Sequence, residues 1–572
     1  MNVNSQFSFF PPQPDNPSDR DRHRLLYDAL SQKGWPEDDQ QILRIMAPPQ
    51  EITNYAEPGK FKGLRVGVIG GGLAGLAAAF ELRKLGFDIT IYDALADRVG
   101  GRVYTYYFDQ EKTLYHEFGP MRIPVAHETV WHYLNLFQLP TRPFIQYNPN
   151  GYVYLRKIRV RNDRDGSQVR KYIYPRYDLH AWEREMSWQD LLYLGTDSHL
   201  LTASPEERAE ILQVKPSYLS KTLRWNARTN LKMMESAALS QEAISLSANF
   251  VPLLYGNLYH SFIDFIQEDY PADLSYLYEI PGGFVQLPNA FYSSFLSPNP
   301  YEQTQGIAPE CLGRVIYQAG HWVNGISFHA CEHKVQLAYQ ALGSGEQGEE
   351  KFDFVVCAIP FSTLRNIRID PLFSPVKMRA IREVNYTPAQ KSLLLCQERF
   401  WEKEGIVGGS SFTDLPIASI WYPSDHAQYL NHPREALSQL KSLPWQEPGV
   451  IIGSFNFNLD TTRLTNQPEE KRFEEIKREI ETVHGLPPGY LNPIVTGYKT
   501  VNWNEEPTIR GAISFFSTEQ KRIFSYGMKL PEYNGRIFFA GEHISAVHRW
   551  MQGALQSGMQ AANDLVLSAR RG

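Results

Sequence analysis

Three glycines and one acidic residue have the spacing of a dinucleotide site. Gly70, Gly72 and Gly75 follow the apolar run 66–69, and Asp93 lies about 20 residues later, the spacing of a residue that accepts a ribose hydroxyl. Such glycines allow a tight turn, close approach of the backbone to a pyrophosphate, and close packing of helix on strand. The phosphates then face a helix N-terminus, where free N–H groups and the dipole favour negative charge. The pattern predicts a bound adenine dinucleotide rather than a structural glycine turn.

Two more segments indicate which dinucleotide is bound. Arg98, Gly101 and Arg102 follow the first unit closely, and Gly541-Glu542 ends an apolar run near the other end of the chain. These segments resemble the Arg-x-Gly-Gly-Arg loop and the C-terminal Gly-Glu motif of the flavin amine oxidase family. The resemblance implies FAD, because its pyrophosphate and ribityl chain need further donors and an acceptor. A surface arginine pair and a helix-capping acid are the alternative.

The same resemblance covers about residues 63–567 and assigns further cofactor contacts to Met121, Val323 and Met551. Segment 548–554 lies where the family places backbone against the flavin. This segment contains no cysteine, so we expect a non-covalent flavin.

An arginine is the expected anchor of the substrate. Gly119-Pro-Met-Arg122 resembles the motif with which L-amino-acid oxidases of this family hold the substrate α-carboxylate. Arginine suits this role because its planar fork can bind a carboxylate through two hydrogen bonds. The alternative is an ordinary salt-bridge residue.

Three other residues match catalytic positions of the family. Lys391 resembles the lysine that holds a water beside the flavin, and a lysine within a leucine-rich strand would otherwise be costly to bury. Trp503 and Trp550 match aromatic walls of the substrate site, although single tryptophans are more often core residues. The chain departs from the family where a tyrosine is expected, at Ser454-Phe455, and where a histidine is expected, at Gln267. Tyr422 is therefore a candidate second donor to the carboxylate.

The predicted reaction is FAD-dependent oxidation of an L-amino acid to a 2-oxo acid, with release of ammonia and hydrogen peroxide. A flavin 2-monooxygenase that forms an amide, and a dehydrogenase with an acceptor other than oxygen, are compatible with the same residues. A non-catalytic flavoprotein is a rival of another class. The joint presence of Arg122, Lys391, Trp503 and Trp550 argues against it.

The predicted substrate carries a basic side chain, arginine or lysine. Acidic residues align near the substrate entrance or follow Trp503, and an apolar substrate would leave buried carboxylates unpaired. An enzyme of broad or aromatic preference is the alternative, since charged runs are usually solvated. The candidate residues for the substrate side chain are Gln267, Glu268, Asp269, Glu505, Glu506 and Tyr422.

The fold predicted to position these residues belongs to the α/β class and has mixed α+β character. We expect a Rossmann-like FAD-binding domain interleaved with a mixed-sheet substrate domain and an inserted helical subdomain. The expected parts are an N-terminal extension at 1–62, FAD-binding parts at 63–123, 275–383 and 526–572, substrate parts at 124–176 and 384–525, and the helical subdomain at 177–274. Ser187 and Ser204 are predicted helix caps, 124–175 is predicted as strands, 354–360 as a buried parallel strand, and 551–567 as a helix.

Composition narrows the partners and the compartment. The 572 residues carry a net charge of −6 without a basic run, so neither nucleic acid nor an anionic membrane is an expected partner. The four cysteines, at 311, 331, 357 and 396, are predicted to be buried free thiols. Residues 1–10 show no export signal and no long apolar stretch occurs, so we expect a cytoplasmic protein. Family resemblance suggests a homodimer or larger homo-oligomer.

Overall fold

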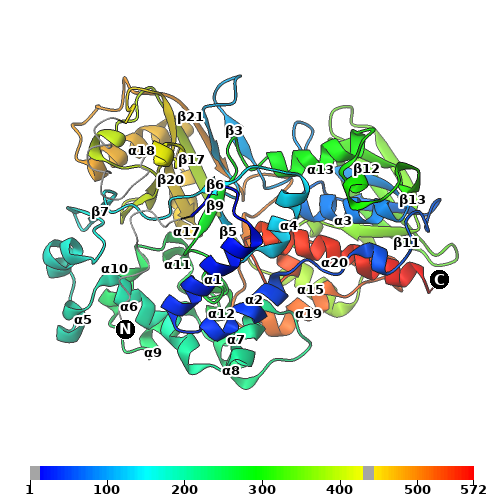
Figure 1. The fold of residues 1–572 in the computed structure, drawn as a ribbon, viewed down its shortest axis with the longest axis horizontal. Coiled ribbons are helices and arrows are strands. Elements are labelled where there is room, and N and C mark those ends of the chain that lie inside the picture. Colours follow the sequence, from blue (N-terminus) through cyan, green and yellow to red (C-terminus); the bar gives the residue numbers. More distant parts are fainter. Residues whose placement is uncertain (1–12, 430–442, 572) are drawn as a thin grey trace.

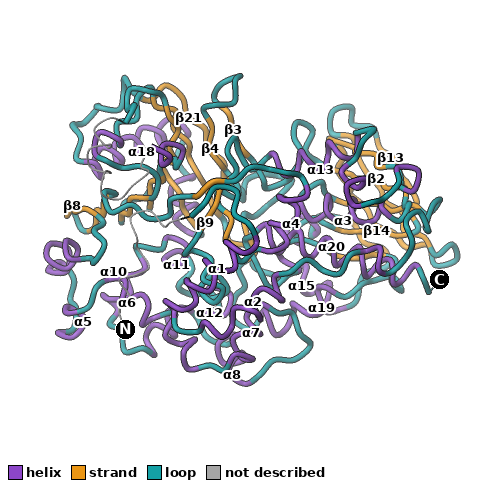
Figure 2. Tube along the Cα trace, in the orientation of Figure 1, coloured by secondary structure: helices purple, strands orange, loops and turns teal. Residues whose placement is uncertain are grey.

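The computed structural model describes residues 13–429 and 443–571; the segment 1–10, used above to predict location, lies outside them. Strands gather in two regions, one at the upper left and one at the right of the view, and most helices lie below them (Figure 1 and Figure 2). The mixed α/β class predicted from sequence is confirmed. The functional residues come from both strand regions.

The right-hand region contains a five-stranded parallel sheet in the order β10-β2-β1-β14-β23. Its strands are short; β1, β2, β14 and β23 are almost wholly buried, which explains their largely apolar sequences, whereas the edge strand β10 is partly exposed. Helix α3 (Leu73–Lys84) connects β1 to β2, and α20 (Met551–Ala569) packs along α3 (Figure 1). The predicted strand at 354–360 and helix at 551–567 are both present. The strand bounds are Arg65–Ile69 for β1, Asp88–Asp93 for β2, Val315–Ala319 for β10, Phe354–Cys357 for β14 and Ile537–Phe539 for β23.

A four-stranded sheet in the order β13-β12-β11-β15 covers the parallel sheet. Its first three strands form an antiparallel meander inserted between β10 and β14. Leu337 of β12 and Phe352 of β13 approach the position that a Cβ on Gly67 of β1 would take, within 2.9 Å, so this glycine allows the close approach of the two sheets. The strand bounds are His321–His329 for β11, Lys334–Ala341 for β12, Gln347–Phe352 for β13 and Arg368–Asp370 for β15.

The left-hand region is a seven-stranded sheet in the order β21-β17-β20-β19-β18-β7-β8. Most pairs are antiparallel, and β7 joins β18 in parallel. The chain therefore enters this sheet at β7 and β8, leaves it, and returns more than 200 residues later, as an interleaved protein must. The strand bounds are Tyr152–Leu155 for β7, Ile158–Arg161 for β8, Ala389–Cys396 for β17, Ser410–Thr413 for β18, Ser419–Trp421 for β19, Gly449–Phe457 for β20 and Val495–Asn502 for β21.

Three small sheets are formed by segments that connect the five-stranded and seven-stranded sheets in the sequence. The order β5-β9-β6 joins segments from 123 to 279, while β3 pairs with β4, and β16 with β22. The strand bounds are Thr105–Tyr107 for β3, Tyr115–Glu117 for β4, Ile123–Pro124 for β5, Arg142–Pro143 for β6, Leu277–Glu279 for β9, Tyr386–Thr387 for β16 and Ile513–Ser514 for β22.

Short helices fill the region from 181 to 265. Ser187 accepts a hydrogen bond from the Asp190 amide, and Ser204 forms a capping box with Glu207, so both predicted caps are present. The helix bounds are Ala181–Glu185 for α5, Trp188–Gly195 for α6, Pro205–Ala209 for α7, Ser220–Asn226 for α8, Asn230–Ser236 for α9, Gln241–Ala248 for α10, Pro252–Gly256 for α11 and Phe262–Phe265 for α12.

The expectation of strands throughout 124–175 is wrong at its start and at its end, where Val169–Ile173 and Tyr174–Arg176 form helical turns. Helix α4 (Glu128–Leu136) occupies the start and buries one face against α20. Apolar residues at 130, 131, 133 and 134 suit a helix face as well as a strand, and only the packing partner decides. The remaining helices are Gln286–Leu296 for α13, Phe361–Leu364 for α14, Pro375–Glu383 for α15, Leu459–Thr465 for α17, Glu469–His484 for α18 and Tyr526–Lys529 for α19.

The N-terminal helices α1 (Asp19–Lys33) and α2 (Asp39–Met46) are built into the molecule. Trp35 between them is fully buried, and its Nε1 donates to the Tyr270 carbonyl at 3.0 Å. Buried Arg208 binds the Asp38 carboxylate through two hydrogen bonds, at 2.6 and 2.9 Å. These contacts tie the segment to the helical region.

Two further sequence expectations concern thiols and membranes. All four cysteines are free; Cys357 and Cys396 are buried, but Cys311 is only half-buried and Cys331 is exposed, so the prediction of four buried thiols is wrong for two of them. Cys331 lies in the turn between β11 and β12, where no layer covers it. In the part of the chain with described positions, no helix combines the length and apolarity needed to cross a bilayer.

Candidate active site

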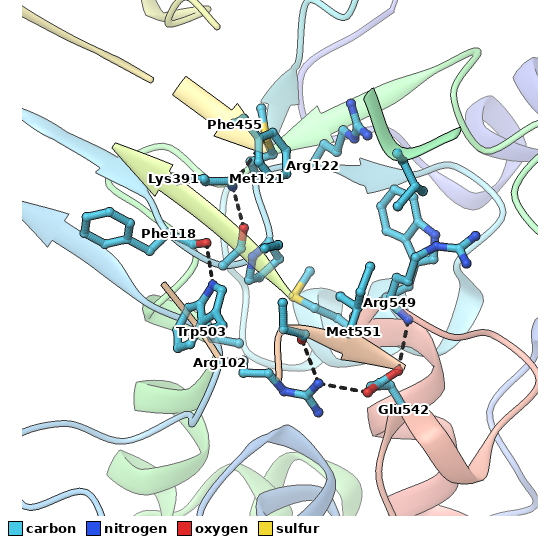
Figure 3. Close-up of a pocket in the computed structure, with 18 of the residues that line it drawn as sticks. Arg102, Phe118, Met121, Arg122, Lys391, Phe455, Trp503, Glu542, Arg549 and Met551 are labelled. Atoms are coloured by element: carbon cyan, nitrogen blue, oxygen red, sulfur yellow. Dashed lines mark hydrogen bonds and ion pairs between the residues drawn. The ribbon is translucent and has the colours of Figure 1, made fainter. Parts of the chain in front are cut away.

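A cavity of about 300 Å³ lies where the parallel sheet, the seven-stranded sheet and the helical region meet. Figure 3 shows Lys391 and Phe455 of the seven-stranded sheet around it, together with Arg102, Glu542 and Met551 from the segments beside the parallel sheet. The sequence-predicted residues that line it are Gly72, Arg102, Met121, Arg122, Glu268, Lys391, Trp503, Gly541, Glu542, Trp550 and Met551. These residues span 480 positions of the chain, and the fold gathers them into one site.

The glycine turn after β1 forms one end of the cavity. Gly72 is the N-cap of α3, and a Cβ there would meet no atom within 4 Å, so open space lies before the helix N-terminus. A Cβ on Gly75 would lie 2.1 Å from the Gly70 carbonyl oxygen, so the helix can pack this closely only on glycine. The Gly100 amide donates to the Gly71 carbonyl at 3.0 Å, which joins the two glycine motifs.

Glu542 and Arg102 form a buried ion pair beside this turn. Arg102 Nη1 lies 2.8 Å from Glu542 Oε1 and also donates to the Ala512 carbonyl at 2.8 Å. The Ser514 hydroxyl donates to Glu542 at 2.6 Å. Burial raises the pKa of Glu542, but the positive charge of Arg102, the neighbouring His548 and His543, and the Ser514 hydrogen bond outweigh it and hold this pKa at about 2. The carboxylate is therefore ionised at neutral pH.

Other residues predicted to contact the cofactor do not line the cavity. Arg98 donates to the carbonyls of Gly101 and Val103 and stacks on Tyr104, so it braces the loop from behind. Val323 is buried within β11.

Asp93, at the end of β2, accepts a hydrogen bond from the Tyr317 hydroxyl at 2.5 Å. The same hydroxyl lies 2.1 Å from where a Cβ on Gly71 would be. The predicted ribose acceptor thus already has a partner from β10.

Arg122 projects into the cavity from the loop between β4 and β5. Its Nη1 donates to Gln146 Oε1 at 2.6 Å, and its guanidinium carbon lies 5.4 Å from the Trp421 ring and 5.9 Å from the Trp550 ring. Among described residues, no carboxylate lies within 4 Å of this guanidinium. Burial lowers its pKa, while Glu268 and Asp273 raise it. Arg122 is thus a half-buried cation with aromatic neighbours and an open side toward the cavity.

Lys391 lies on β17, the second strand of the seven-stranded sheet, between the edge strand β21 and β20. Its Nζ donates to the carbonyls of Glu117 and Gly119, at 3.1 and 2.8 Å, and lies 4.7 Å from the Phe455 ring. Burial lowers the pKa of Lys391 to about 7, with a further decrease from Arg122 and an opposing effect of Glu117. The amine can therefore exchange a proton near neutral pH.

The two tryptophans form opposite parts of the wall. Trp503 follows β21, and its Nε1 donates to the Phe118 carbonyl at 3.1 Å. Trp550 is the N-cap of α20, and its Nε1 donates to Glu268 Oε1 at 3.0 Å. Because each indole N–H has a fixed acceptor, both rings are held in one orientation.

Most of the residues that were predicted to contact the substrate side chain do not line the cavity. Gln267 binds backbone at both ends, accepting from the His548 amide and donating to the Asp264 carbonyl, each at 2.9 Å. Asp269 lies 3.9 Å from Lys33 in the N-terminal segment. Glu505 is exposed and Glu506 half-buried in the turn after Trp503. Glu268 alone of these acids lines the cavity.

Tyr422 is also placed elsewhere. Its hydroxyl is buried at 2.8 Å from both Ser411 Oγ and His484 Nε2, and the residue lines a separate cavity of about 50 Å³. It therefore cannot serve as the second donor to a carboxylate on Arg122.

Sequence reasoning missed most of the apolar wall. Phe455 and Phe457 are two residues apart on β20, so the alternation of strand side chains places both on one face with Lys391; this signal was available. The segment 250–253, which runs from the connection after α10 into the start of α11, had no such signal, because only the packing of the helical region brings it to the sheet. The residues missed are Gln146, Phe250, Val251, Pro252, Leu253, Gln390, Phe412, Trp421, Phe455, Phe457 and Arg549.

The residues at the glycine end fit an FAD molecule. The open space before Gly72 would admit a phosphate to the N-terminus of α3. Arg102 supplies a cation beside this space, and Glu542 supplies carboxylate oxygens that can accept from hydroxyl groups. The N-terminus of α20 at Met551 faces the same cavity.

The sequence model of the flavin-containing amine oxidoreductase family matches residues 73–566. This chain belongs to that family. Membership identifies the cofactor as a flavin, and the glycine turn with its helix N-terminus identifies the adenine dinucleotide form, FAD.

Relatives and solved structures agree with this assignment. Bacillus subtilis YobN, whose name assigns it provisionally to the L-amino-acid oxidases, is 30% identical over 506 residues, which cover 87% of this chain and 94% of YobN. The L-amino-acid oxidase of Pseudechis australis is 28% identical over 509 residues, covering 89% of this chain and 87% of that protein.

The solved structures show likeness of fold. Cyclohexylamine oxidase from Brevibacterium oxydans superposes with a TM-score of 0.64 at 15% identity, over 89% of this chain and all of that one. Putrescine oxidase superposes with a TM-score of 0.64 at 16% identity, over 88% of this chain and 99% of that one. Among the described residues of this family member, no cluster of histidine, cysteine or acidic side chains could hold a metal ion.

Proposed function

We propose that this flavin-containing amine oxidoreductase is an FAD-dependent L-amino-acid oxidase that forms 2-oxo acids, ammonia and hydrogen peroxide. The observation that carries the proposal is Arg122, a half-buried residue whose guanidinium faces the cavity and has no carboxylate within 4 Å among described residues. A cation left in this state is costly unless a ligand supplies the anion. The α-carboxylate of an amino acid would supply it, whereas a simple amine could not.

The chain's own residues act by positioning and by charge. Arg122 and Gln146 orient the carboxylate, and the rings of Trp421, Trp503 and Trp550 limit the volume left for the rest of the substrate. Bound FAD would accept two electrons from the substrate α-carbon and pass them to oxygen. Lys391, with its pKa near 7, can hold or release a proton, or orient a water, at the inner wall.

The charges of the cavity favour a substrate side chain without charge. Arg102 is paired with Glu542, and Arg549 with Glu268. Arg122 is left to bind one carboxylate, and the remaining wall is largely aromatic and aliphatic. The hypothesis of a basic substrate now depends on Glu268 alone, because Asp269, Glu505 and Glu506 lie elsewhere, and Glu268 already has two partners.

The experiment is an anaerobic titration of the purified holoprotein with each of the twenty L-amino acids, followed by product analysis in air. Bleaching of the flavin by L- but not D-amino acids, with a 2-oxo acid and peroxide as products, is the expected result. Carbon dioxide and an amide would identify a 2-monooxygenase instead. Bleaching without oxygen uptake would identify a dehydrogenase, and no bleaching by any amino acid would reject the proposal.

Two sequence expectations stay predictions, the cytoplasmic location and the homo-oligomer. Cell fractionation would decide the first, and light scattering of the holoprotein the second.

A further inference from the structure

Arg549, between His548 and Trp550, has a backbone conformation that few residues with a Cβ adopt. Its φ is 74°, in the left-handed region that favours glycine. Its side chain is nevertheless buried, and the residue lines the active-site cavity. Something in its surroundings must hold this conformation.

The side chain of Arg549 supplies the restraint. Its Nε donates to Glu268 Oε1 at 2.9 Å, its Nη1 to the Asp264 carbonyl at 2.8 Å and its Nη2 to the Phe265 carbonyl at 3.4 Å. Its guanidinium carbon also lies 4.9 Å from the Phe515 ring. This guanidinium thus joins the loop before α20 to residues 264–268, beside the hydrogen bonds that His548 makes with Gln267 and Asp264.

Glu268 is the acceptor on which this arrangement depends. Of the described residues that line the cavity, only Glu268 and Glu542 carry carboxylates, and Glu542 is engaged by Arg102 at the cofactor end. Glu268 Oε1 receives both Arg549 and the Trp550 indole. Among the described residues, Glu268 is therefore the one carboxylate that lines the cavity away from the cofactor end, and its partner is a cation of the chain itself. Asp264 Oδ2 lies 3.8 Å from Arg549 Nη1 but does not line the cavity.

Trp550 links Glu268 to the carboxylate anchor. Its ring lies 5.9 Å from the Arg122 guanidinium carbon, and its Nε1 lies 3.0 Å from Glu268 Oε1. Across one indole, an anion-binding arginine and a buried carboxylate face the same cavity. An extended lysine or arginine has a carboxylate and a cation at its two ends, a charge pattern complementary to this pair.

We propose that Arg549 takes, on Glu268, the place that the cationic side chain of a substrate would take, and so excludes lysine and arginine from the site. The proposal rests on the proposed L-amino-acid oxidation and adds its substrate class: uncharged side chains are accepted because the carboxylate is already neutralised. A basic side chain would have to displace Arg549 or remain buried beside it without a counter-charge.

The decisive variant is Arg549→Gly, which retains the left-handed backbone and removes the guanidinium. Glu268 then lacks a cation, and the ratio of kcat/KM for L-lysine to that for L-leucine should rise by about tenfold or more, as expected for a charge pair shielded from water. The matched control is Arg549→Gly combined with Glu268→Gln, which has the same backbone and space but no carboxylate and should show no such rise.

A binding measurement tests the charge effect without turnover. Hexanoate and 6-aminohexanoate both offer a carboxylate to Arg122, neither can be oxidised at an α-amine, and only the second has a terminal ammonium. Their dissociation constants are measured from the change in flavin absorbance of the holoprotein. Native protein should bind hexanoate more tightly, Arg549→Gly should reverse the order, and the double variant should restore it.

The outcomes separate this inference from the proposed function. If no amino acid bleaches the flavin, the proposed oxidase activity is rejected, while the two hexanoates still report on Arg549 and Glu268. If neutral amino acids are oxidised but Arg549→Gly gives unchanged ratios, or the double variant gains lysine equally, the role of Arg549 is rejected. If Arg549→Gly does not fold, Arg549→Asn replaces it, since asparagine also tolerates the left-handed region.

Discussion

The residue that most directly selects an amino acid over a simple amine is Arg122. Replacing it with lysine keeps a positive charge but removes the planar fork that can bind a carboxylate through two hydrogen bonds. We expect Arg122→Lys to raise KM and Arg122→Met to raise it further. For Arg122→Met, the decrease in kcat/KM should correspond to a free energy of about 2 to 5 kcal/mol. Steady-state kinetics measure both, and an unchanged flavin spectrum serves as the control. Equal KM values in all three proteins would contradict the assignment.

Lys391 should make the stability of the protein depend on pH. Its pKa is lowered to about 7 on folding from its ordinary value of 10.5. Between these values the unfolded chain binds more protons than the folded one, so the unfolding free energy rises with pH over this range and is level outside it.

In Lys391→Met the slope between pH 7 and 10 should fall by up to about 1.4 kcal/mol per pH unit, the maximum for one proton. Urea unfolding at several pH values measures the slope. Lys377→Met is the matched control, since burial lowers the pKa of Lys377 to about 7 as well, outside the cavity. It should reduce the slope equally without changing the flavin spectrum. Equal slopes for native protein and Lys391→Met would show that Lys391 has an ordinary pKa.

At the scale of elements, the turn from β1 into α3 performs two tasks with different glycines. Gly75 allows the helix to pack on the turn, because a Cβ there would lie 2.1 Å from the Gly70 carbonyl oxygen. Gly72 has an ordinary φ of −77° and space around it, so it needs no glycine for packing. An added methyl at Gly72 would instead occupy the space through which a phosphate reaches the helix N-terminus.

We therefore expect Gly75→Ala to destabilise the apoprotein by about 1 to 3 kcal/mol, as overpacking does. Gly72→Ala should leave apoprotein stability unchanged and weaken FAD binding. Thermal unfolding without flavin and fluorescence titration with FAD separate the two effects. If both variants lose stability equally, the division of tasks is wrong.

Elements with a strong local pattern could be predicted, and those fixed by packing could not. The strand at 354–357 is apolar throughout, and the caps at Ser187 and Ser204 have local mechanisms, so sequence was sufficient for them. The positions of helix α4 and of the segment 250–253 in the cavity wall depend on packing partners that are distant in the chain.

The candidate site shows the same limit. Arg122, Lys391 and both tryptophans reach one cavity, but the acids Glu505 and Glu506 lie in a turn outside it. A pair of acids has the same sequence whether it faces solvent or substrate. Only the fold shows which acid lines the cavity, and that acid, Glu268, also has a partner that sequence reasoning missed, Arg549.

At the scale of the whole molecule, the N-terminal helices are part of the folded body. Trp35 is fully buried under the helical region, so Trp35→Ala should cost about 3 to 5 kcal/mol of unfolding free energy, as for other buried large-to-small replacements. Tyr27→Ala in α1, where the ring is 50% exposed, should stay within about 0.5 kcal/mol of the native protein. Urea unfolding monitored by circular dichroism measures both. Equal effects would show that the segment adds little to stability.

The position of β23 and α20 has a consequence for how a ribosome makes this protein. The strand completes the parallel sheet, α20 covers α3, and Glu542, Trp550 and Met551 complete the cavity, yet all are translated more than 450 residues after the glycine turn at 70–75. The glycine turn emerges from the ribosome hundreds of residues earlier, when these partners have not yet been synthesised. Flavin capture should therefore follow the emergence of residues 537–569 from the ribosome. Chains stalled before residue 537 should remain colourless. Chains extended past residue 569 by a linker long enough to clear the exit tunnel should take up FAD while still attached to the ribosome. Uptake of FAD by the shorter chains would disprove this order.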